Sequence, residues 1–190
     1  MLYKKRGKLI LISGPMYAGK SRRLIHIYEE LVDDEQKAIA VAPSQDDRTE
    51  QIESRSGVKI PTIKVKSIKD IEDKIKGYNY IFIDEFHFFN EELIQIVKKL
   101  LKKNKTLVLS GLDMDFKAKN FEAYDTLREI ADQEFKMTAI CHTCGKIAQY
   151  SRKDESKSDP NARIEVDNLG DTIYFSACGE CHPYINKENE

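Results

Sequence analysis

The segment from Leu9 to Leu31 constrains the fold more than any other part of the chain. It begins with a short apolar run, Leu9–Ser13, and continues through the loop Gly14–Ser21, which has the form Gly-x-x-x-x-Gly-Lys-Ser. It ends in a stretch whose apolar residues recur at helical spacing. A buried strand, a glycine loop and an amphipathic helix in this order are typical of a phosphate-binding crossover unit, so they predict an α/β fold with parallel strands.

The residue types of this loop suit the phosphate groups of a nucleotide. Glycines let the backbone approach phosphate oxygens, and the N–H groups at the start of the following helix attract negative charge. Lys20 is expected to reach the β- and γ-phosphates and Ser21 to bind Mg²⁺. A chance match on a glycine turn is the alternative, and the flanking strand and helix weigh against it. The loop predicts ATP and Mg²⁺ as cofactors, bound by Gly14, Pro15, Met16, Tyr17, Ala18, Gly19, Lys20 and Ser21.

Two carboxylates follow a second apolar run, at Ile81-Phe82-Ile83-Asp84-Glu85. The carboxyl ends of parallel strands meet at one edge of a sheet, so these side chains are expected near the glycine loop. Asp84 is placed to hold Mg²⁺, often through water, and Glu85 is then free to act as a base toward a hydroxyl or water. An ordinary acidic turn is the alternative, and it would be the better interpretation if the glycine loop were absent.

The rest of the N-terminal part alternates between strand and helix patterns. Apolar runs at Ala38–Ala42 and Thr106–Ser110 predict further buried strands, like those at Leu9–Ser13 and Ile81–Asp84. Helical spacing is seen in three places. Leu24, Ile27, Tyr28 and Leu31 form one apolar face; Leu93, Ile96, Val97, Leu100 and Leu101 form another after the N-cap Asn90; residues 121–132 form the third.

All four cysteines occur in two Cys-x-x-Cys pairs, Cys141/Cys144 and Cys178/Cys181. Four thiolates are what a closed tetrahedral zinc site uses, so the grouping favours a structural Zn²⁺ over disulfides. Free thiols or a redox pair are the alternatives. His182 follows Cys181 and could replace it as a ligand, but the equal spacing of the two pairs favours Cys181.

The sequence pattern changes near residue 136, where the alternation of strand and helix segments ends. We expect a phosphate-binding α/β domain at residues 1–136, a zinc-binding domain at residues 137–185 and a flexible polar tail at residues 186–190. The polar stretch Ser151–Asn161 between the cysteine pairs is expected to be a mobile loop.

Charge and hydropathy exclude several classes of partner. The chain has 31 Lys and Arg against 32 Asp and Glu, a net charge of −1. It therefore lacks the excess of positive charge that is typical of proteins that bind long nucleic acid or a membrane surface. The apolar run after the basic N-terminus is too short for a signal peptide, and no stretch is long enough to span a bilayer. We expect a cytoplasmic protein without nucleic-acid or membrane partners. This disfavours a zinc-binding nucleic-acid module with a degenerate nucleotide site, whereas an ATPase in which Glu85 activates water stays open.

Several motifs, taken in order, resemble those of the type II thymidine kinases. The loop 14–21 is similar to the family's G-P-M-[FY]-[SA]-G-K-[ST], and Pro43-x-x-Asp46-x-Arg48 to its P-x-x-D-x-R. Residues 84–89, Asp-Glu-Phe-His-Phe-Phe, resemble D-E-A-Q-F-F, and residues 111–116 resemble G-L-D-x-D-F. Cys141-x-x-Cys144-Gly145 and Tyr174-x-x-x-Cys178-x-x-Cys181-His182 match its zinc-site segments. The resemblance covers about residues 8–182.

This resemblance implies a RecA-like P-loop domain with a mostly parallel sheet, plus a small zinc-binding domain with a lasso loop. It implies transfer of the γ-phosphate of Mg-ATP to the 5′-hydroxyl of thymidine, giving dTMP in nucleotide salvage, with Glu85 as the base. It also implies a homotetramer and dTTP as a feedback inhibitor. Arg48, Asp84, Glu85, Phe86 and His87 would join the loop on the cofactor side. The nucleoside would be bound by Met16, Phe88, Leu112, Phe116, Leu169, Gly170 and Tyr174.

The chain departs from the family pattern at positions that bear on base preference. His87 stands in place of the usual Gln, Phe86 in place of a small residue, and Leu169-Gly170 in place of paired glycines. A kinase for a different deoxynucleoside is therefore the alternative within the same chemistry. The loop, Glu85 and the four cysteines follow the pattern.

Overall fold

The computed structural model describes residues 6–33, 36–44, 52–53, 59–89, 91–154, 156 and 173–185. Several residues singled out from the sequence lie outside this part of the chain: Asp46, Arg48, the N-cap Asn90, Leu169 and Gly170, together with most of the expected loop that ends at Asn161. The expected tail at 186–190 lies outside it as well.

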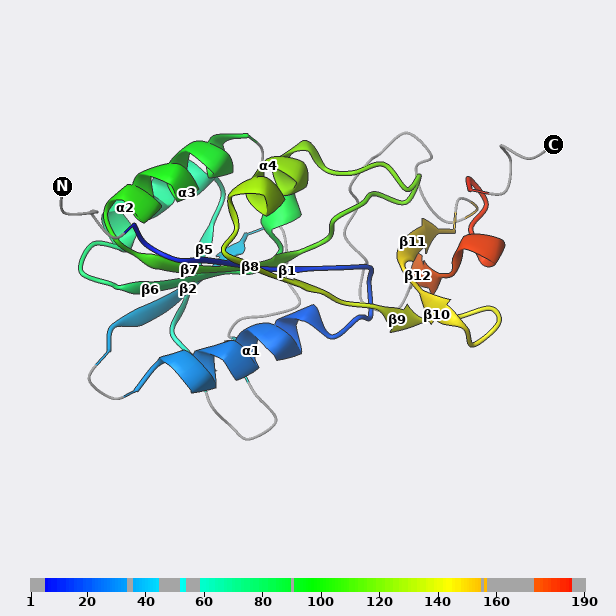
Figure 1. Cartoon of the computed structure of the whole chain (residues 1–190), viewed down its shortest axis with the longest axis horizontal. Coiled ribbons are helices and arrows are strands. Elements are labelled where there is room, and N and C mark those ends of the chain that lie inside the picture. The colour runs from blue at the N-terminus through cyan, green and yellow to red at the C-terminus, as the bar shows by residue number, and fades with distance from the viewer. Residues whose placement is uncertain are drawn as a thin grey trace.

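A six-stranded parallel sheet forms the centre of the molecule and confirms the predicted α/β fold (Figure 1). Its strand order is β5-β2-β6-β7-β1-β8, and every neighbouring pair is parallel. The carboxyl ends of all six strands therefore lie along one edge, where α/β proteins bind ligands. The strands are β1 (Leu9–Ser13), β2 (Ala38–Pro43), β5 (Thr62–Val65), β6 (Tyr80–Ile83), β7 (Thr106–Gly111) and β8 (Gln133–Lys136).

Helices cover both faces of this sheet (Figure 1). The apolar side of α1 packs on one face, and α2, α3 and α4 pack on the other, so the sheet separates two hydrophobic cores. Within the described residues, no helix combines the length and apolar character needed to cross a membrane. The helices are α1 (Lys20–Leu31), α2 (Ile71–Lys74), α3 (Glu92–Lys102) and α4 (Glu122–Ile130), with 3-10 turns η1 (Ile68–Asp70), η2 (Phe86–Phe88) and η3 (Gly179–Cys181).

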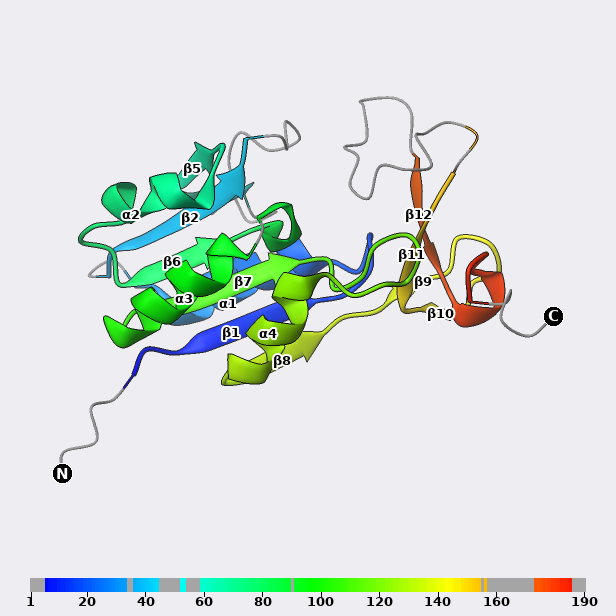
Figure 2. The same ribbon diagram turned by 90° about the horizontal axis from the view of Figure 1, so that it is seen from above.

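Short antiparallel pairs complete the structure. The pairs β9–β10 and β11–β12 lie together beyond one end of the large sheet (Figure 2). The expectation of a mobile loop beginning at Ser151 is wrong at its start, because Ser151–Lys153 belong to β11 and pair with β12. The bounds are β3 (Ile52–Glu53), β4 (Lys59–Ile60), β9 (Ala139–Ile140), β10 (Ile147–Ala148), β11 (Tyr150–Lys153) and β12 (Tyr174–Ala177).

Candidate active site and metal centre

The glycine loop lies between β1 and α1, at the carboxyl edge of the sheet. Gly14 has a φ of 144°, and a Cβ atom there would lie 2.5 Å from the carbonyl oxygen of Met137, so only glycine fits. Gly19 precedes α1 with a φ of 79°. The Nζ of the buried Lys20 donates to the carbonyl oxygen of Pro15 at 2.9 Å, which keeps the ammonium against the loop. The local sequence thus folds into a curved loop that carries a cation.

Asp84 follows β6 and lies beside this loop. Its side chain is buried, and its Oδ1 accepts the backbone N–H of Glu85 at 3.0 Å. Burial raises the pKa of Asp84, whereas the Ser21 hydroxyl and the Lys20 ammonium act in the opposite direction. The carboxylate and the hydroxyl that the sequence assigns to Mg²⁺ are therefore neighbours, and both are oxygen ligands of the kind that Mg²⁺ prefers.

Glu85 has a backbone conformation that side-chain-bearing residues rarely adopt. Its φ is 51° and its ψ is 46°, in the left-handed region, and its side chain is only 18% exposed. Strain of this kind is common at functional sites. Its Oε2 lies 3.5 Å from Nδ1 of His87, but that nitrogen accepts the backbone N–H of Leu112 at 3.2 Å. Nδ1 therefore carries no proton, and the contact with Glu85 is not an ion pair.

The apolar residues assigned to the nucleoside fall into two groups. Met16, Phe116 and Tyr174 come together in one cluster, although they belong to the glycine loop, the segment after β7 and β12. In the second group, His87 contacts Leu112 through the hydrogen bond above and the ring of Phe88 at a centroid distance of 4.6 Å.

Phe86 is placed differently from the other assigned residues. Its side chain is fully buried, and a Cβ atom on Gly111 would lie 2.6 Å from its ring. Glycine at position 111 therefore leaves the space into which Phe86 packs. Only the backbone of Phe86 is left for the cofactor role that the sequence assigns to it.

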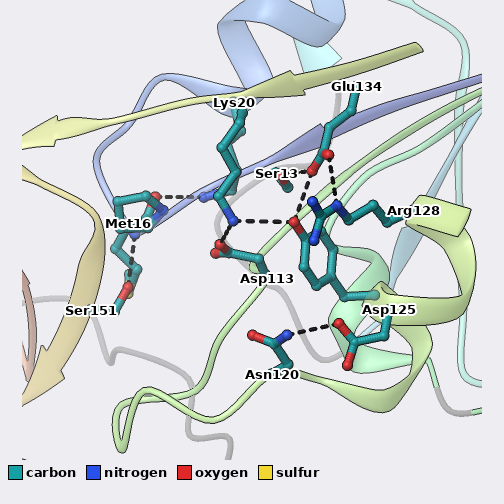
Figure 3. Close-up of polar contacts among 12 residues, drawn as sticks. Ser13, Met16, Lys20, Asp113, Asn120, Asp125, Arg128, Glu134 and Ser151 are labelled. Atoms are coloured by element: carbon teal, nitrogen blue, oxygen red, sulfur yellow. Dashed lines mark hydrogen bonds and ion pairs between the residues drawn. The ribbon is translucent and has the colours of Figure 1, made fainter. Parts of the chain in front are cut away.

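Two residues that the sequence did not single out contact this site from β11. The Oγ of Ser151 accepts the backbone N–H of Met16 at 2.9 Å (Figure 3). Lys153 is buried, with its Nζ 5.1 Å from the centroid of the Phe116 ring and 5.9 Å from that of Tyr174. In the structure the second and fourth residues of Tyr-Ser-Arg-Lys are buried, but the sequence does not show this, because both are polar. Four residues without an alternating apolar set are too weak a pattern to predict a strand.

A polar network fixes the segment after β7 against β8. The Lys136 ammonium pairs with the buried Asp113 carboxylate and donates to the Tyr124 hydroxyl at 3.2 Å. Glu134 accepts from the Ser13 hydroxyl at 2.7 Å and from the Tyr124 hydroxyl at 2.9 Å (Figure 3). Burial lowers the pKa of Lys136, but the Asp113 carboxylate outweighs it, so the pKa is raised. The segment that carries Leu112 and Phe116 is thus tied to the sheet.

The four cysteines form a compact sulfur cluster. Their Sγ atoms all lie within 4.8 Å of one another, and those of Cys144 and Cys178 are 3.6 Å apart. Sulfurs bound to tetrahedral zinc at 2.3 Å would be about 3.8 Å apart, so the cluster fits this ion. Burial raises the pKa of Cys141, but backbone N–H groups, Cys178 first, lower it to about 6, which favours the thiolate that a metal binds.

His182 does not belong to the sulfur cluster. Its Nε2 lies 3.2 Å from the carbonyl oxygen of Ser151 instead. This arrangement favours Cys181 over His182 as the fourth ligand, the choice that the spacing of the two pairs predicts.

Comparison with known proteins agrees with this geometry. A family model described as thymidine kinase matches residues 7–182. A thymidine kinase of Mesomycoplasma hyopneumoniae strain 7448 is 38% identical over 187 residues, covering 95% of this chain and 99% of the relative. One of Pseudothermotoga lettingae is 32% identical over 187 residues, with coverages of 97% and 99%. One of Ureaplasma urealyticum serovar 10 is 33% identical over 200 residues, with coverages of 98% and 90%. The resemblance of the motifs is confirmed, and this chain belongs to the thymidine kinase family.

Proposed function

We propose that this chain is a thymidine kinase that transfers the γ-phosphate of Mg-ATP to the 5′-hydroxyl of thymidine, giving dTMP for nucleotide salvage. One observation carries the proposal. Asp84, which lies beside Ser21 and Lys20, is followed directly by Glu85, and the same glycine loop contributes Met16 to a cluster with Phe116 and Tyr174. A phosphate-type glycine loop, a carboxylate and an aromatic cluster therefore belong to one edge of the sheet.

The glycine loop would bind the phosphates. Its backbone N–H groups, Lys20 and Arg48 would stabilise negative charge on the transferring group. Mg²⁺, held by Ser21 and Asp84, would supply further positive charge next to the β- and γ-phosphates. His87 and the backbone of Phe86 would border this site through their place next to Glu85. The full cofactor set is Gly14, Pro15, Met16, Tyr17, Ala18, Gly19, Lys20, Ser21, Arg48, Asp84, Glu85, Phe86 and His87.

Glu85 would accept the proton of the 5′-hydroxyl on a carboxylate oxygen as that hydroxyl attacks the phosphoryl group. Its left-handed backbone and mostly buried side chain support a fixed orientation for this transfer. The aromatic residues suit a flat base, and closure over the nucleoside would exclude water and favour transfer over hydrolysis. The nucleoside set is Met16, Phe88, Leu112, Phe116, Leu169, Gly170 and Tyr174.

The remaining features extend the same proposal. Zn²⁺ would be held by Cys141, Cys144, Cys178 and Cys181 and would stabilise the region around them. A boundary between domains at residue 136 is supported by the end of β8, the last strand of the large sheet, so we divide the chain into 1–136, 137–185 and a tail at 186–190. The family resemblance supports a homotetramer, feedback inhibition by dTTP and a cytoplasmic location.

The test is ADP formation from Mg-ATP, measured with and without each deoxynucleoside, for the wild type and Glu85→Gln. We expect thymidine to stimulate turnover strongly. Without its base, the Gln variant should lose about 10²- to 10⁴-fold in kcat. Glu129→Gln, which changes an exposed carboxylate on α4, is the matched control and should behave like the wild type.

Each other outcome has a defined meaning. Stimulation by a different deoxynucleoside would keep the phosphoryl transfer and move the base preference, pointing to His87 and to Leu169-Gly170. ADP formation that is indifferent to every nucleoside would contradict the kinase and favour an ATPase.

A further inference from the structure

His182 is a fully buried side chain that the proposed mechanism does not use. It has 0% exposure, and it follows Cys181 directly, although its ring does not belong to the sulfur cluster. A buried polar ring needs hydrogen-bond partners, and the identity of these partners shows what it does.

Both ring nitrogens of His182 contact the backbone. The N–H of Tyr184 donates to Nδ1 at 3.4 Å, and Nε2 lies 3.2 Å from the carbonyl oxygen of Ser151. Because Nδ1 accepts, we assign the proton of the neutral ring to Nε2, which then donates to Ser151.

These partners of His182 are in contact with residues assigned to the proposed nucleoside pocket. Ser151 accepts the backbone N–H of Met16 through its Oγ, and Met16 packs in the cluster that holds Phe116 and Tyr174. The ring of Phe116 meets that of Tyr184, whose backbone N–H donates to His182. One imidazole therefore contacts β11 directly, through the backbone of Ser151, and the segment after β7 indirectly, through Tyr184 and Phe116.

Aromatic packing holds the ring in this position. The centroid of His182 lies 5.4 Å from that of Tyr150 and 6.1 Å from that of Tyr184. Tyr184 in turn meets Phe116 edge to face at 6.1 Å. The ring cannot move without moving the wall of the pocket or the turn that carries Cys181.

We propose that His182 is a positioning residue that couples the cysteine cluster to the nucleoside pocket. It sets the position of Ser151 directly and that of Phe116 through Tyr184, and so the shape of the wall formed by Met16 and Phe116. The inference rests on the proposed function, because the pocket is the one assigned to thymidine. It assigns different roles to two neighbouring residues. Cys181 would bind the metal, and His182 would hold the residues of the pocket in a fixed position relative to the cysteine cluster.

The experiment compares His182→Phe, His182→Gln and His182→Asn in the full-length protein. Phe keeps a ring but has no N–H for the carbonyl of Ser151, so KM for thymidine should rise about tenfold, as expected when a buried polar group loses its partner. The amide nitrogen of Gln reaches the position of Nε2 and should restore KM to within about threefold of the wild type. That of Asn reaches only the position of Nδ1, so it should resemble Phe. KM for ATP and kcat should change by less than about twofold, and each variant should keep one zinc per chain.

His142→Phe is the matched control, because His142 is an exposed histidine of the same region that stacks on Phe175. It should leave every constant at the wild-type value. Loss of zinc from the Gln variant would make His182 a ligand and overturn the proposal, as would a Phe or Asn variant with an unchanged KM for thymidine. If the Phe variant does not fold, the difference between Gln and Asn decides. Failure of the proposed function is visible separately, as a wild type that no nucleoside stimulates.

Discussion

The large sheet and the cysteine-bearing region are stabilised by different physics. The strands β1, β2, β6 and β7 are almost wholly buried, with large aliphatic and aromatic side chains packed on both faces. The core around the cysteines consists of small residues: Ala18, Ala139, Cys141, Ala148 and Cys178. Its large apolar residues Ile140 and Ile147 are 67% and 66% exposed. A core of this size cannot order a chain by burial alone, and the proposed zinc ion would supply what is missing.

The proposed nucleoside site draws on both regions. Met16 and Phe116 come from the sheet domain, whereas Tyr174 and Ser151 come from strands next to the cysteines. Activity should therefore depend on both the buried core of the sheet and the cysteine cluster, and either can be lost without the other. Substitutions chosen in one region or the other should separate loss of activity from loss of the sheet.

The largest effect is expected from Cys144→Ser. Cys144 is exposed, so the change creates no cavity and removes only one thiolate of the cluster. Binding of structural zinc contributes about 10–16 kcal/mol in zinc-finger peptides, so the region around β9–β12 should lose its order. Thymidine-dependent turnover should fall more than about 100-fold, while far-UV circular dichroism of the sheet domain is largely kept.

The control for this change is Thr143→Ala, at an exposed position between the two cysteines. It should keep one zinc per chain and normal turnover. A Cys144→Ser protein with both zinc and full activity would show that the region is held by its own packing, and the contrast between the two regions would fall.

The difference in burial also explains which strands the sequence could predict. The strand at Leu9–Ser13 was predicted with its observed bounds, because a strand buried on both faces is a continuous apolar run. The edge strands β5 and β8 were missed, because Thr-Ile-Lys-Val and Gln-Glu-Phe-Lys are only half buried and mix polar with apolar residues. A local sequence pattern indicates how deeply a strand is buried. The edge strands β5 and β8 are buried too little to produce a clear pattern.

The candidate site divides in the same way. The glycine loop, Asp84 and Glu85 could be found because their chemistry is written in consecutive residues. Ser151 and His182 could not, because their roles depend on which backbone groups the fold brings to them from 135 and 31 residues away. Such contacts are set by the pairing of β11 with β12 and by the cysteine cluster, which no short motif records.

A core truncation in the sheet, Leu107→Ala, is the next largest change. Leu107 has 0% exposure in the central strand β7, and removing its three outer side-chain carbons should cost about 2–5 kcal/mol of unfolding free energy. For a domain of this size Tm should fall by roughly 5–15 °C. Zinc content and KM for thymidine should stay unchanged at 25 °C.

Ile147→Ala is the matched control, since it removes as many carbons from an exposed site near the cysteines. It should change the unfolding free energy by less than about 0.5 kcal/mol. Equal costs for the two truncations, measured by urea unfolding, would contradict the claim that burial stabilises one region and not the other.

An intermediate effect is expected where the segment after β7 is tied to β8. Lys136→Met leaves the buried Asp113 without its cation, which should cost about 1–3 kcal/mol, the lower part applying because Lys136 is 45% exposed. Adding Asp113→Asn should recover part of this loss, since the buried charge is removed. A double variant less stable than Lys136→Met alone, by urea unfolding, would contradict this pairing.

The pH dependence of this pair has a defined sign. The pKa of Lys136 is raised in the folded state, so its contribution to stability is complete below its unfolded value of 10.5 and is lost as pH rises through the folded value. Wild type and Lys136→Met should therefore converge in Tm above pH 10.5 and differ most near neutral pH. A constant difference across this range would mean that the ammonium charge is not what stabilises the segment.

The smallest change in stability, and one of opposite sign, is expected from Asp84→Asn. Burial raises the pKa of Asp84 above its unfolded value of 3.8, so the ionised carboxylate opposes folding, increasingly as pH rises from that value through the folded pKa. The Asn oxygen can still accept the N–H of Glu85, so the variant should be more stable than the wild type without Mg²⁺, with a larger gain in Tm at pH 8 than at pH 5. Turnover should nevertheless fall about 10²- to 10³-fold, because the carboxylate that would hold Mg²⁺ next to the transferring phosphate is lost. A variant less stable at pH 8 would mean that Asp84 stabilises the sheet edge. A gain in stability with a loss of turnover would show that this edge keeps a buried charge for chemistry at the expense of folding.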